Sequence, residues 1–204
     1  MAAPYPTPAC RLWRMTIARS LVLVRHGETA WSRDRRHTGR TDLPLTDLGR
    51  QQGDILAARL ARYTFARVLC SPLQRAAETC RRACPGAIIE PCTDALEWDY
   101  GVYEGRRTDD IRRDIPGWSV WTHAIIGGEA VDDVGARADR VIEHALATSG
   151  TVAVFAHAHF LRIVGARWIG LAAVAGRSFV LEPATVSVLG FEREERVIER
   201  WNDA

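Results

Sequence analysis

The sequence predicts an α/β protein in which a mostly parallel β-sheet is covered by helices on both faces. From residue 20 onward, short apolar runs of strand length alternate with longer amphipathic stretches, which is typical of parallel sheets with crossover helices. The runs at residues 21–24 and 151–155 are almost continuously apolar, as expected for strands buried on both faces. Each run leads within two residues to a histidine, so His26 and His157 should meet at the carboxyl edge of the sheet.

After the opening strand, we expect a polar, arginine-rich loop over residues 32–41 and then a helix. Thr46 is a suitable N-cap for this helix, which should end near residue 62. Its expected apolar stripe consists of Leu48, Ile55, Leu56 and Leu60. A short strand over residues 66–70 follows. Pro72 then fits the first position of a second helix that ends near residue 83, because proline needs no hydrogen bond there.

The second half of the chain continues the alternation after a short strand over residues 87–89. Pro116 and Gly117 separate two expected helical stretches, residues 109–114 and 118–123. A longer helix should span residues 131–147, and another follows His157. Residues 178–182 and 185–191 are predicted to be late strands separated by Pro183. This late region either completes the sheet or forms the interface of a homodimer, and the sequence leaves both open.

Composition limits the classes of function. The 204 residues are expected to form a single domain over residues 20–204, preceded by a disordered extension over residues 1–19 that holds three prolines. No segment approaches the roughly 20 apolar residues of a membrane helix. The net charge of +2 gives no reason to expect nucleic acid or a membrane as a partner. Five cysteines, an odd number, favour a reducing, cytoplasmic location, and their spacing does not predict a zinc site.

The cations of this chain are unusual because all 27 are arginines. The absence of lysine excludes Schiff-base chemistry and a P-loop lysine. Any phosphate or carboxylate must therefore be bound by arginine, whose planar guanidinium suits bidentate contacts. Arg25 lies beside His26, and Arg75 lies one turn into the helix after Pro72. Together with His157 these residues predict an anion pocket with a nucleophile, in which a neighbouring guanidinium keeps the imidazole neutral.

Three motifs in this order resemble the histidine phosphatase (phosphoglycerate mutase-like) superfamily, over about residues 20–192. The motifs are Leu23-Val24-Arg25-His26-Gly27-Glu28-Thr29, Cys70-Ser71-Pro72-Leu73-Gln74-Arg75-Ala76-Ala77-Glu78-Thr79 and Phe155-Ala156-His157-Ala158-His159. The resemblance implies a three-layer α/β/α sandwich of the phosphoglycerate mutase-like type. It also implies phosphoryl transfer through a phosphohistidine on small phosphorylated metabolites, with no metal and no cofactor.

The resemblance further implies a role for each matched residue. His26 would be the nucleophile, while Arg25, Arg75 and His157 would hold the phosphoryl oxygens. Glu97 occupies the position of the proton donor, and a raised pKa would suit that role. The residues expected to contact or border the substrate are Ser32, Thr38, Gly39, Tyr100, Ala158 and Arg162.

Several neighbouring residues are expected to play other roles. Glu28 is expected to be structural, holding an arginine in orientation. His37 is assigned to a loop or to solvent. Trp118 and Trp121 are expected in the core, with a lid over the site as the alternative. Gly27 is expected to let the backbone pass close to a ligand.

Departures from the mutase pattern favour hydrolysis. Only about 30 residues separate Gly101 from Val131, too few for the insertion that supplies extra cations in the mutases. Ser32 replaces an Asn of the mutases, and Ala158 replaces the usual Gly. The resemblance is closest to a branch with mycobacterial acid phosphatases and the fungal sedoheptulose bisphosphatase, so we expect a phosphatase of sugar phosphates or related monoesters. A mutase and a catalytically idle phospho-ligand-binding module remain as alternatives.

Overall fold

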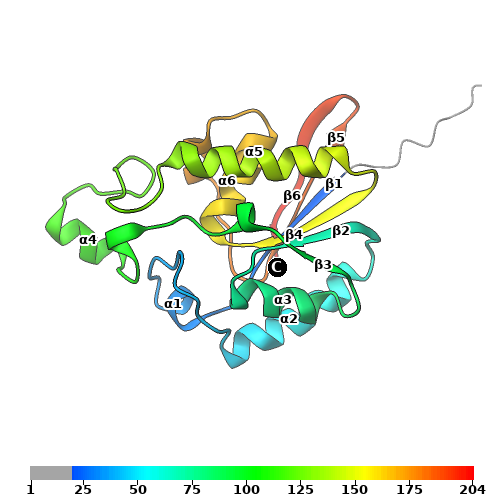
Figure 1. The fold of residues 1–204 in the computed structure, drawn as a ribbon, viewed down its shortest axis with the longest axis horizontal. Coiled ribbons are helices and arrows are strands. Elements are labelled where there is room, and N and C mark those ends of the chain that lie inside the picture. The colour runs from blue at the N-terminus through cyan, green and yellow to red at the C-terminus, as the bar shows by residue number, and fades with distance from the viewer. Residues whose placement is uncertain (1–19) are drawn as a thin grey trace, which may run out of the picture.

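A six-stranded mixed sheet forms the centre of the computed structural model, which describes residues 20–204. The strand order is β3-β2-β4-β1-β5-β6 (Figure 1). The strands are β1 (Ser20–Arg25), β2 (Phe65–Cys70), β3 (Ile89–Pro91), β4 (Thr151–Ala156), β5 (Val186–Glu192) and β6 (Glu195–Asp203). The first four run parallel to one another, whereas β5 is antiparallel to both β1 and β6. The predicted mostly parallel sheet is confirmed.

Helices cover both faces of this sheet, which gives the predicted three layers (Figure 1). The helices are α1 (Ala30–Arg33), α2 (Asp47–Leu60), α3 (Gln74–Ala83), α4 (Thr108–Asp114), α5 (Val131–Ala147) and α6 (Ala158–Trp168). Three short 3-10 segments are η1 (Thr93–Ala95), η2 (Gly101–Tyr103) and η3 (Ala173–Ser178). In Figure 1, α2 and α3 lie below the sheet, while α5 and α6 lie above it. The phosphoglycerate mutase-like α/β/α architecture is therefore confirmed.

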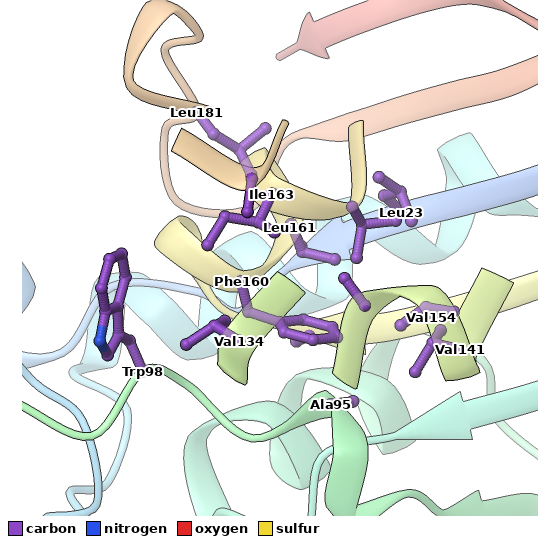
Figure 2. Close-up of a cluster of buried hydrophobic side chains, with 14 of the residues drawn as sticks. Leu23, Ala95, Trp98, Val134, Val141, Val154, Phe160, Leu161, Ile163 and Leu181 are labelled. Carbon is purple, nitrogen blue, oxygen red and sulfur yellow. The ribbon is translucent and has the colours of Figure 1, made fainter. Parts of the chain in front are cut away.

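The alternation of side chains along β1 assigns one apolar cluster to each face. Leu21 and Leu23 pack with residues of α5 and α6, whereas Val22 and Val24 pack with residues of α2 and α3. Figure 2 shows the first cluster, in which Leu23 lies near Leu161 of α6. Because both faces are covered, the strand is apolar at every position, which explains its continuous hydrophobic run.

Several predicted elements were wrong or displaced. Pro72 is not the first residue of a helix, since α3 begins at Gln74, whose backbone N–H donates to Asp42 Oδ1 at 2.8 Å. The third short strand starts at Ile89 and not at residue 87. Residues 118–123 form turns where a helix was predicted, and residues 178–182 form no strand. The edge strand β6 was missed.

The apolar stripe predicted for α2 was only half right. Leu56 and Leu60 are buried, but Leu48 and Ile55 are 49% and 64% exposed. The buried face instead continues through Gly49 and Gly53. Glycines on the buried face let this helix approach its neighbours more closely than a leucine stripe would allow.

Gly49 and Gly27 lie in direct backbone contact at the start of α2. A Cβ atom on Gly27 would lie 2.4 Å from Gly49 O, and one on Gly49 would lie 2.1 Å from Glu28 O. The Thr46 hydroxyl, which caps α2 as predicted, also donates to Glu28 Oε1 at 2.8 Å. A side chain at Gly27 would therefore meet this helix, and the close approach of the Gly27 backbone to a ligand stays a prediction. Glu28 faces a threonine hydroxyl where an arginine was expected.

Replacing Gly49 by alanine should lower the free energy of unfolding by about 3 kcal/mol, because the new methyl group meets backbone that cannot rotate away. Chemical denaturation followed by circular dichroism would measure this change. Gly53→Ala is the matched control in the same helix, since its Cβ would meet only the Arg82 side chain at 3.1 Å. It should change the free energy of unfolding by no more than about 1 kcal/mol. Equal effects of the two substitutions would contradict the packing argument.

Three remaining expectations concern the edges and ends of the chain. The expected disordered extension, residues 1–19, lies outside the described residues. β5 pairs with β1 on one side and with β6 on the other, so the late region completes the sheet. A homodimer stays a prediction. Within residues 20–204, no helix is long and apolar enough to cross a membrane.

Candidate active site

The two predicted histidines meet where β1 and β4 end side by side. Arg25 pairs with Ala156 in the parallel register, and the backbone N–H of His26 donates to Ala156 O at 3.0 Å. The His26 and His157 rings lie 5.1 Å apart between their centroids, at 60° to each other. Both side chains are buried. The sheet register thus brings two imidazoles from distant parts of the sequence into one site.

The hydrogen bond of the His26 ring determines which nitrogen can react. Nδ1 lies 2.7 Å from Gly27 O, and because a carbonyl only accepts, Nδ1 carries the proton. Nε2 of the neutral ring then holds an unshared electron pair. Burial lowers the pKa of His26 well below its usual value, and the charges of Arg75 and Arg25 lower it further. The ring is therefore neutral near pH 7 and has its nucleophilic nitrogen available.

Arg75 and His157 form a fully buried polar network beside the nucleophile. Arg75 Nε donates to His157 Nδ1 at 3.2 Å, so the His157 proton sits on Nε2, which lies 2.7 Å from Ser71 Oγ. The terminal nitrogens of Arg75 donate to the backbone carbonyls of Thr38, Gly39 and Thr41. Burial and the Arg75 charge lower the pKa of His157 well below its usual value. The network fixes the position of a permanent positive charge next to His26.

Arg25 brings a second positive charge with an unpaired donor. One terminal nitrogen donates to Leu181 O, whereas Nε is buried and has no hydrogen-bond partner among residues 20–204. Burial lowers the pKa of Arg25 to about 10, so the guanidinium remains charged near neutral pH. A buried N–H without a partner is costly unless a ligand supplies an acceptor. An anion in this pocket would satisfy it.

Glu97 is held by the first turn of α6. Its Oε1 accepts hydrogen bonds from the backbone N–H groups of Trp98 and Phe160, both at 2.9 Å, and Oε2 accepts one from His159 at 3.1 Å. Oε2 accepts only one of these hydrogen bonds, so it is the oxygen better placed to carry a proton. Burial raises the pKa of Glu97, although the three N–H donors and the charge of Arg75 act in the opposite direction. The carboxyl group is thus suited both to give up a proton and to carry the resulting charge.

An ion pair supports the loop that carries Glu97. Arg137 of α5 donates to both carboxylate oxygens of Glu129, at 2.8 and 2.9 Å. The same guanidinium donates to the carbonyls of Asp94, Leu96 and Glu97. Burial tends to raise the pKa of Glu129, but the Arg137 hydrogen bond and its other donors bring it below its usual value. Both partners are therefore charged, and they fix the backbone around the candidate acid.

A cavity of about 770 Å³ opens at this site, although Arg75 and His157, which are fully buried, are not among the residues that line it. Arg25, His26 and Glu97 line it, as do four residues predicted to contact the substrate: Ser32, Thr38, Tyr100 and Ala158. The Ser32 hydroxyl accepts a hydrogen bond from Thr29 N–H at 2.8 Å and donates to Thr29 O at 3.0 Å, so it completes a capping box with Thr29, the N-cap of α1. This volume is in the range typical of small-molecule sites, so there is room for more than a phosphate group.

Two predicted contact residues lie outside the cavity wall. Gly39 is buried, and its N–H and carbonyl groups are bonded to Glu104 and Arg75. Arg162 donates to the carbonyls of Gly176 and Arg177. Its guanidinium carbon lies 4.8 Å from the centre of the Trp121 ring, behind the wall. Their contact with substrate stays a prediction, and in this arrangement both act by supporting other residues.

The cavity wall contains four further aromatic residues, of which the sequence placed Trp118 and Trp121 at the site only as an alternative to the core and left His37 and His159 unassigned to it. His37, Trp118, Trp121 and His159 all line the cavity together with Tyr100. The Tyr100 hydroxyl contacts His159 Nδ1 at 2.5 Å, and burial lowers the pKa of His37 to about 4. His37 lies in a loop, which confirms one of its two predicted assignments, and it is half-buried. The sequence signal that could have identified His37 is its position directly before Thr38 and Gly39. His37 becomes part of the cavity wall because Tyr100 and Trp118 pack against it.

The described part of the chain shows no arrangement of three or more His, Cys, Asp or Glu residues that could hold a metal ion. Cys70, Cys80, Cys84 and Cys92 are free thiols. Arginines and imidazoles are among the groups that line the cavity, and they are donors suited to an oxyanion.

Comparison with known proteins gives one family. The profile of the histidine phosphatase superfamily (branch 1) matches residues 21–204. An acid phosphatase of Mycobacterium tuberculosis is 41% identical over 181 residues, which cover 86% of this chain and 88% of the relative. Sedoheptulose 1,7-bisphosphatase of Saccharomyces cerevisiae is 29% identical over 187 residues, which cover 74% of this chain and 67% of the relative.

Solved structures agree with this result. The structure of an open reading frame of Mycobacterium tuberculosis superimposes with a TM-score of 0.87 at 39% identity and covers 91% of this chain and 98% of its own. A mycobacterial glucosyl-3-phosphoglycerate phosphatase in complex with VO3 has a TM-score of 0.83 at 26% identity, with coverages of 92% and 100%. The similarity thus spans both the sequence motifs and the arrangement of the sheet.

Proposed function

The chain belongs to branch 1 of the histidine phosphatase superfamily, and on this premise we propose that it hydrolyses phosphate monoesters of small metabolites through a phosphohistidine on His26. The observation that carries the proposal is the His26 ring: Nδ1–H is bound to Gly27 O, and the low pKa leaves Nε2 unprotonated between two arginines. Sugar phosphates and related esters, as named for several relatives, are the proposed substrates.

In the first step, the Nε2 electron pair attacks phosphorus and the bond to the ester oxygen breaks. Arg25 and Arg75 stabilise the negative charge on the equatorial oxygens, and His157 is the third proposed donor. His157 Nε2–H must then turn from Ser71 Oγ to the phosphoryl group. Glu97 gives its proton to the leaving oxygen, which departs as an alcohol.

In the second step, water attacks the phosphohistidine. Glu97, now a carboxylate, takes a proton from the water as the new P–O bond forms. The P–N bond breaks and its electron pair returns to His26 Nε2, which releases inorganic phosphate. The N–H groups of Trp98, Phe160 and His159 stabilise the charged carboxylate between the two steps.

Hydrolysis is favoured over internal transfer by the chain between Glu97 and α5. This segment holds only η2, α4 and turns, so it adds no further domain to close over the cavity. A mutase must exclude water while its substrate turns over in the site. A catalytically idle binding module is the other alternative, but such a module has no use for a buried carboxylic acid beside the imidazole. A reducing, cytoplasmic location stays a prediction that is compatible with the free thiols.

A phosphate-release assay on a panel of sugar phosphates and glycerate phosphates, with EDTA present, tests this proposal. We expect inorganic phosphate to be released in equal amount to the alcohol product, and we expect EDTA to leave the rate unchanged. Isotopically labelled phosphate that stays on carbon, without net release, would instead support a mutase. No turnover of any ester would support the binding module.

A further inference from the structure

The outer rim of the cavity carries more arginines than the proposed chemistry uses. Arg33, Arg35, Arg36 and Arg112 all line the cavity. Asp34 lies near two of them, with its oxygens 3.5 Å from Arg33 Nε and 3.9 Å from Arg36 Nε. Two of the three guanidinium groups on the 33–36 segment thus share one carboxylate. Glu28 and Glu182 also line the cavity, so the four rim arginines, which are separate from Arg25 and Arg75, outnumber the carboxylates that the chemistry does not use.

Arg35 holds a backbone conformation that glycine adopts far more readily. Its φ angle is +56°, and it occupies the position that follows the C-cap of α1. Arg36 N–H donates to Trp31 O and Arg35 N–H donates to Ser32 O, which is the hydrogen-bond pattern of a Schellman motif. Glycine is favoured at this position because a Cβ atom is strained there. Among residues 20–204 no carboxylate pairs with the Arg35 guanidinium, so no internal contact compensates for the strain.

A buried donor without a partner lies on the facing segment. Trp118 is 1% exposed, and its indole N–H has no acceptor among the described residues. Its carbonyl accepts a hydrogen bond from Arg112 Nε at 2.8 Å. The Trp118 ring also packs edge-on against His37, 5.3 Å between centroids, two residues after Arg35. Arg35 and Trp118, which come from two separate segments, therefore line the same cavity, and each has a donor without a partner among residues 20–204.

We propose that Arg35, Arg112 and the Trp118 indole N–H form a second anion subsite, which binds another anionic group of the substrate while His26 reacts with the phosphate. The inference rests on the proposed function and narrows its substrates to phosphate esters that carry a second phosphate or a carboxylate. Such a group would accept the buried indole hydrogen and pair with the Arg35 guanidinium. The cavity volume of about 770 Å³ leaves room for both ends of such a molecule.

Binding to the His26→Ala variant tests the subsite without turnover. Calorimetry would compare fructose 1,6-bisphosphate with fructose 1-phosphate, and 3-phosphoglycerate with glycerol 3-phosphate. In each pair the first compound adds one anionic group, a phosphate or a carboxylate, so the two pairs show which one the subsite takes. We expect at least one of these compounds to bind about tenfold more tightly than its partner.

Substitution of the rim should remove this preference. We expect the ratio of the two Kd values of the preferred pair to fall in each of two variants made in the His26→Ala background. These variants are Arg35→Gly and Trp118→Phe, and the expected decrease is about threefold or more. Arg35→Gly should also raise the midpoint of thermal unfolding, because it relieves the backbone strain. Loss of affinity together with a gain in stability would separate a binding role from a structural one.

The matched control is Arg193→Gly, because Arg193 has a φ angle of +58° in the hairpin between β5 and β6. This hairpin lies at the opposite edge of the sheet, so its variant should gain stability and keep the affinity ratio. An unchanged ratio in Arg35→Gly, or an equal loss for both members of a pair, would overturn the subsite. A different result would refute the proposed function: the wild-type protein would bind these compounds but release no phosphate from them.

Discussion

Replacing His26 by alanine should lower kcat for p-nitrophenyl phosphate by about 10,000-fold, to the background of the assay. The loss is expected because Nε2 is the atom proposed to form the covalent bond to phosphorus. His157, the neighbouring ring, has both nitrogens engaged with Arg75 and Ser71. Steady-state release of p-nitrophenolate would measure the effect.

A labelling experiment links this loss to the covalent intermediate. Wild-type protein incubated with a ³²P-labelled ester and quenched without acid should carry label, whereas His26→Ala should carry none. His144→Ala is the control, since His144 is exposed near the end of α5 and far from the site edge. Turnover by His26→Ala close to the wild-type rate would refute the mechanism.

Glu97→Gln should separate the two chemical steps. Alkyl phosphates need a proton on their leaving oxygen, so their turnover should fall by about 1,000-fold. p-Nitrophenolate leaves without such help, so this substrate should still phosphorylate His26. In the second step the attacking water then has no base to take its proton, so the phosphoenzyme should accumulate. Rapid mixing should therefore show a burst of about one p-nitrophenolate per protein, followed by a slow steady rate.

The pH dependence provides an internal control for this variant. Burial raises the pKa of Glu97 and lowers that of His26, so protonated Glu97 and neutral His26 coexist between the two pKa values. With alkyl phosphates, wild-type activity should fall as the pH rises through the Glu97 pKa, because the acid form is lost. Glu97→Gln should lack this decline. A variant that kept both the wild-type rate and the decline would exclude Glu97 as the acid.

The sequence predicted the centre of the site better than its periphery. His26 and His157 follow apolar runs that are recognisable as parallel strands, and parallel strands necessarily end at one edge. Glu97 was identified only through the family resemblance. Its environment depends on α6 N–H groups that are about 60 residues away in the chain, which no local pattern reports. Its burial is a tertiary property.

The missed features share a physical cause. β6 follows a turn at Arg193 that has no glycine, asparagine or proline, so the usual hairpin signal is absent. Gly49 and Gly53 form a packing face that a count of apolar side chains overlooks. His37 and Trp118 belong to the cavity wall because loops from distant segments pack together. Each of these features is determined by contacts between segments, whereas the sequence pattern reports only what lies within one segment.

The junction of β4 and α6 restricts how the length of this chain can change. His157 is the N-cap of α6, and the N–H groups of His159 and Phe160, the second and third residues of that helix, hold Glu97. An insertion or deletion of one residue here would rotate the helix by about 100° relative to the strand. The candidate acid and the second histidine would then be lost together. The loops that carry Arg35 and Trp118 have no such tie to Glu97, so related chains can vary in length there and keep the same chemistry.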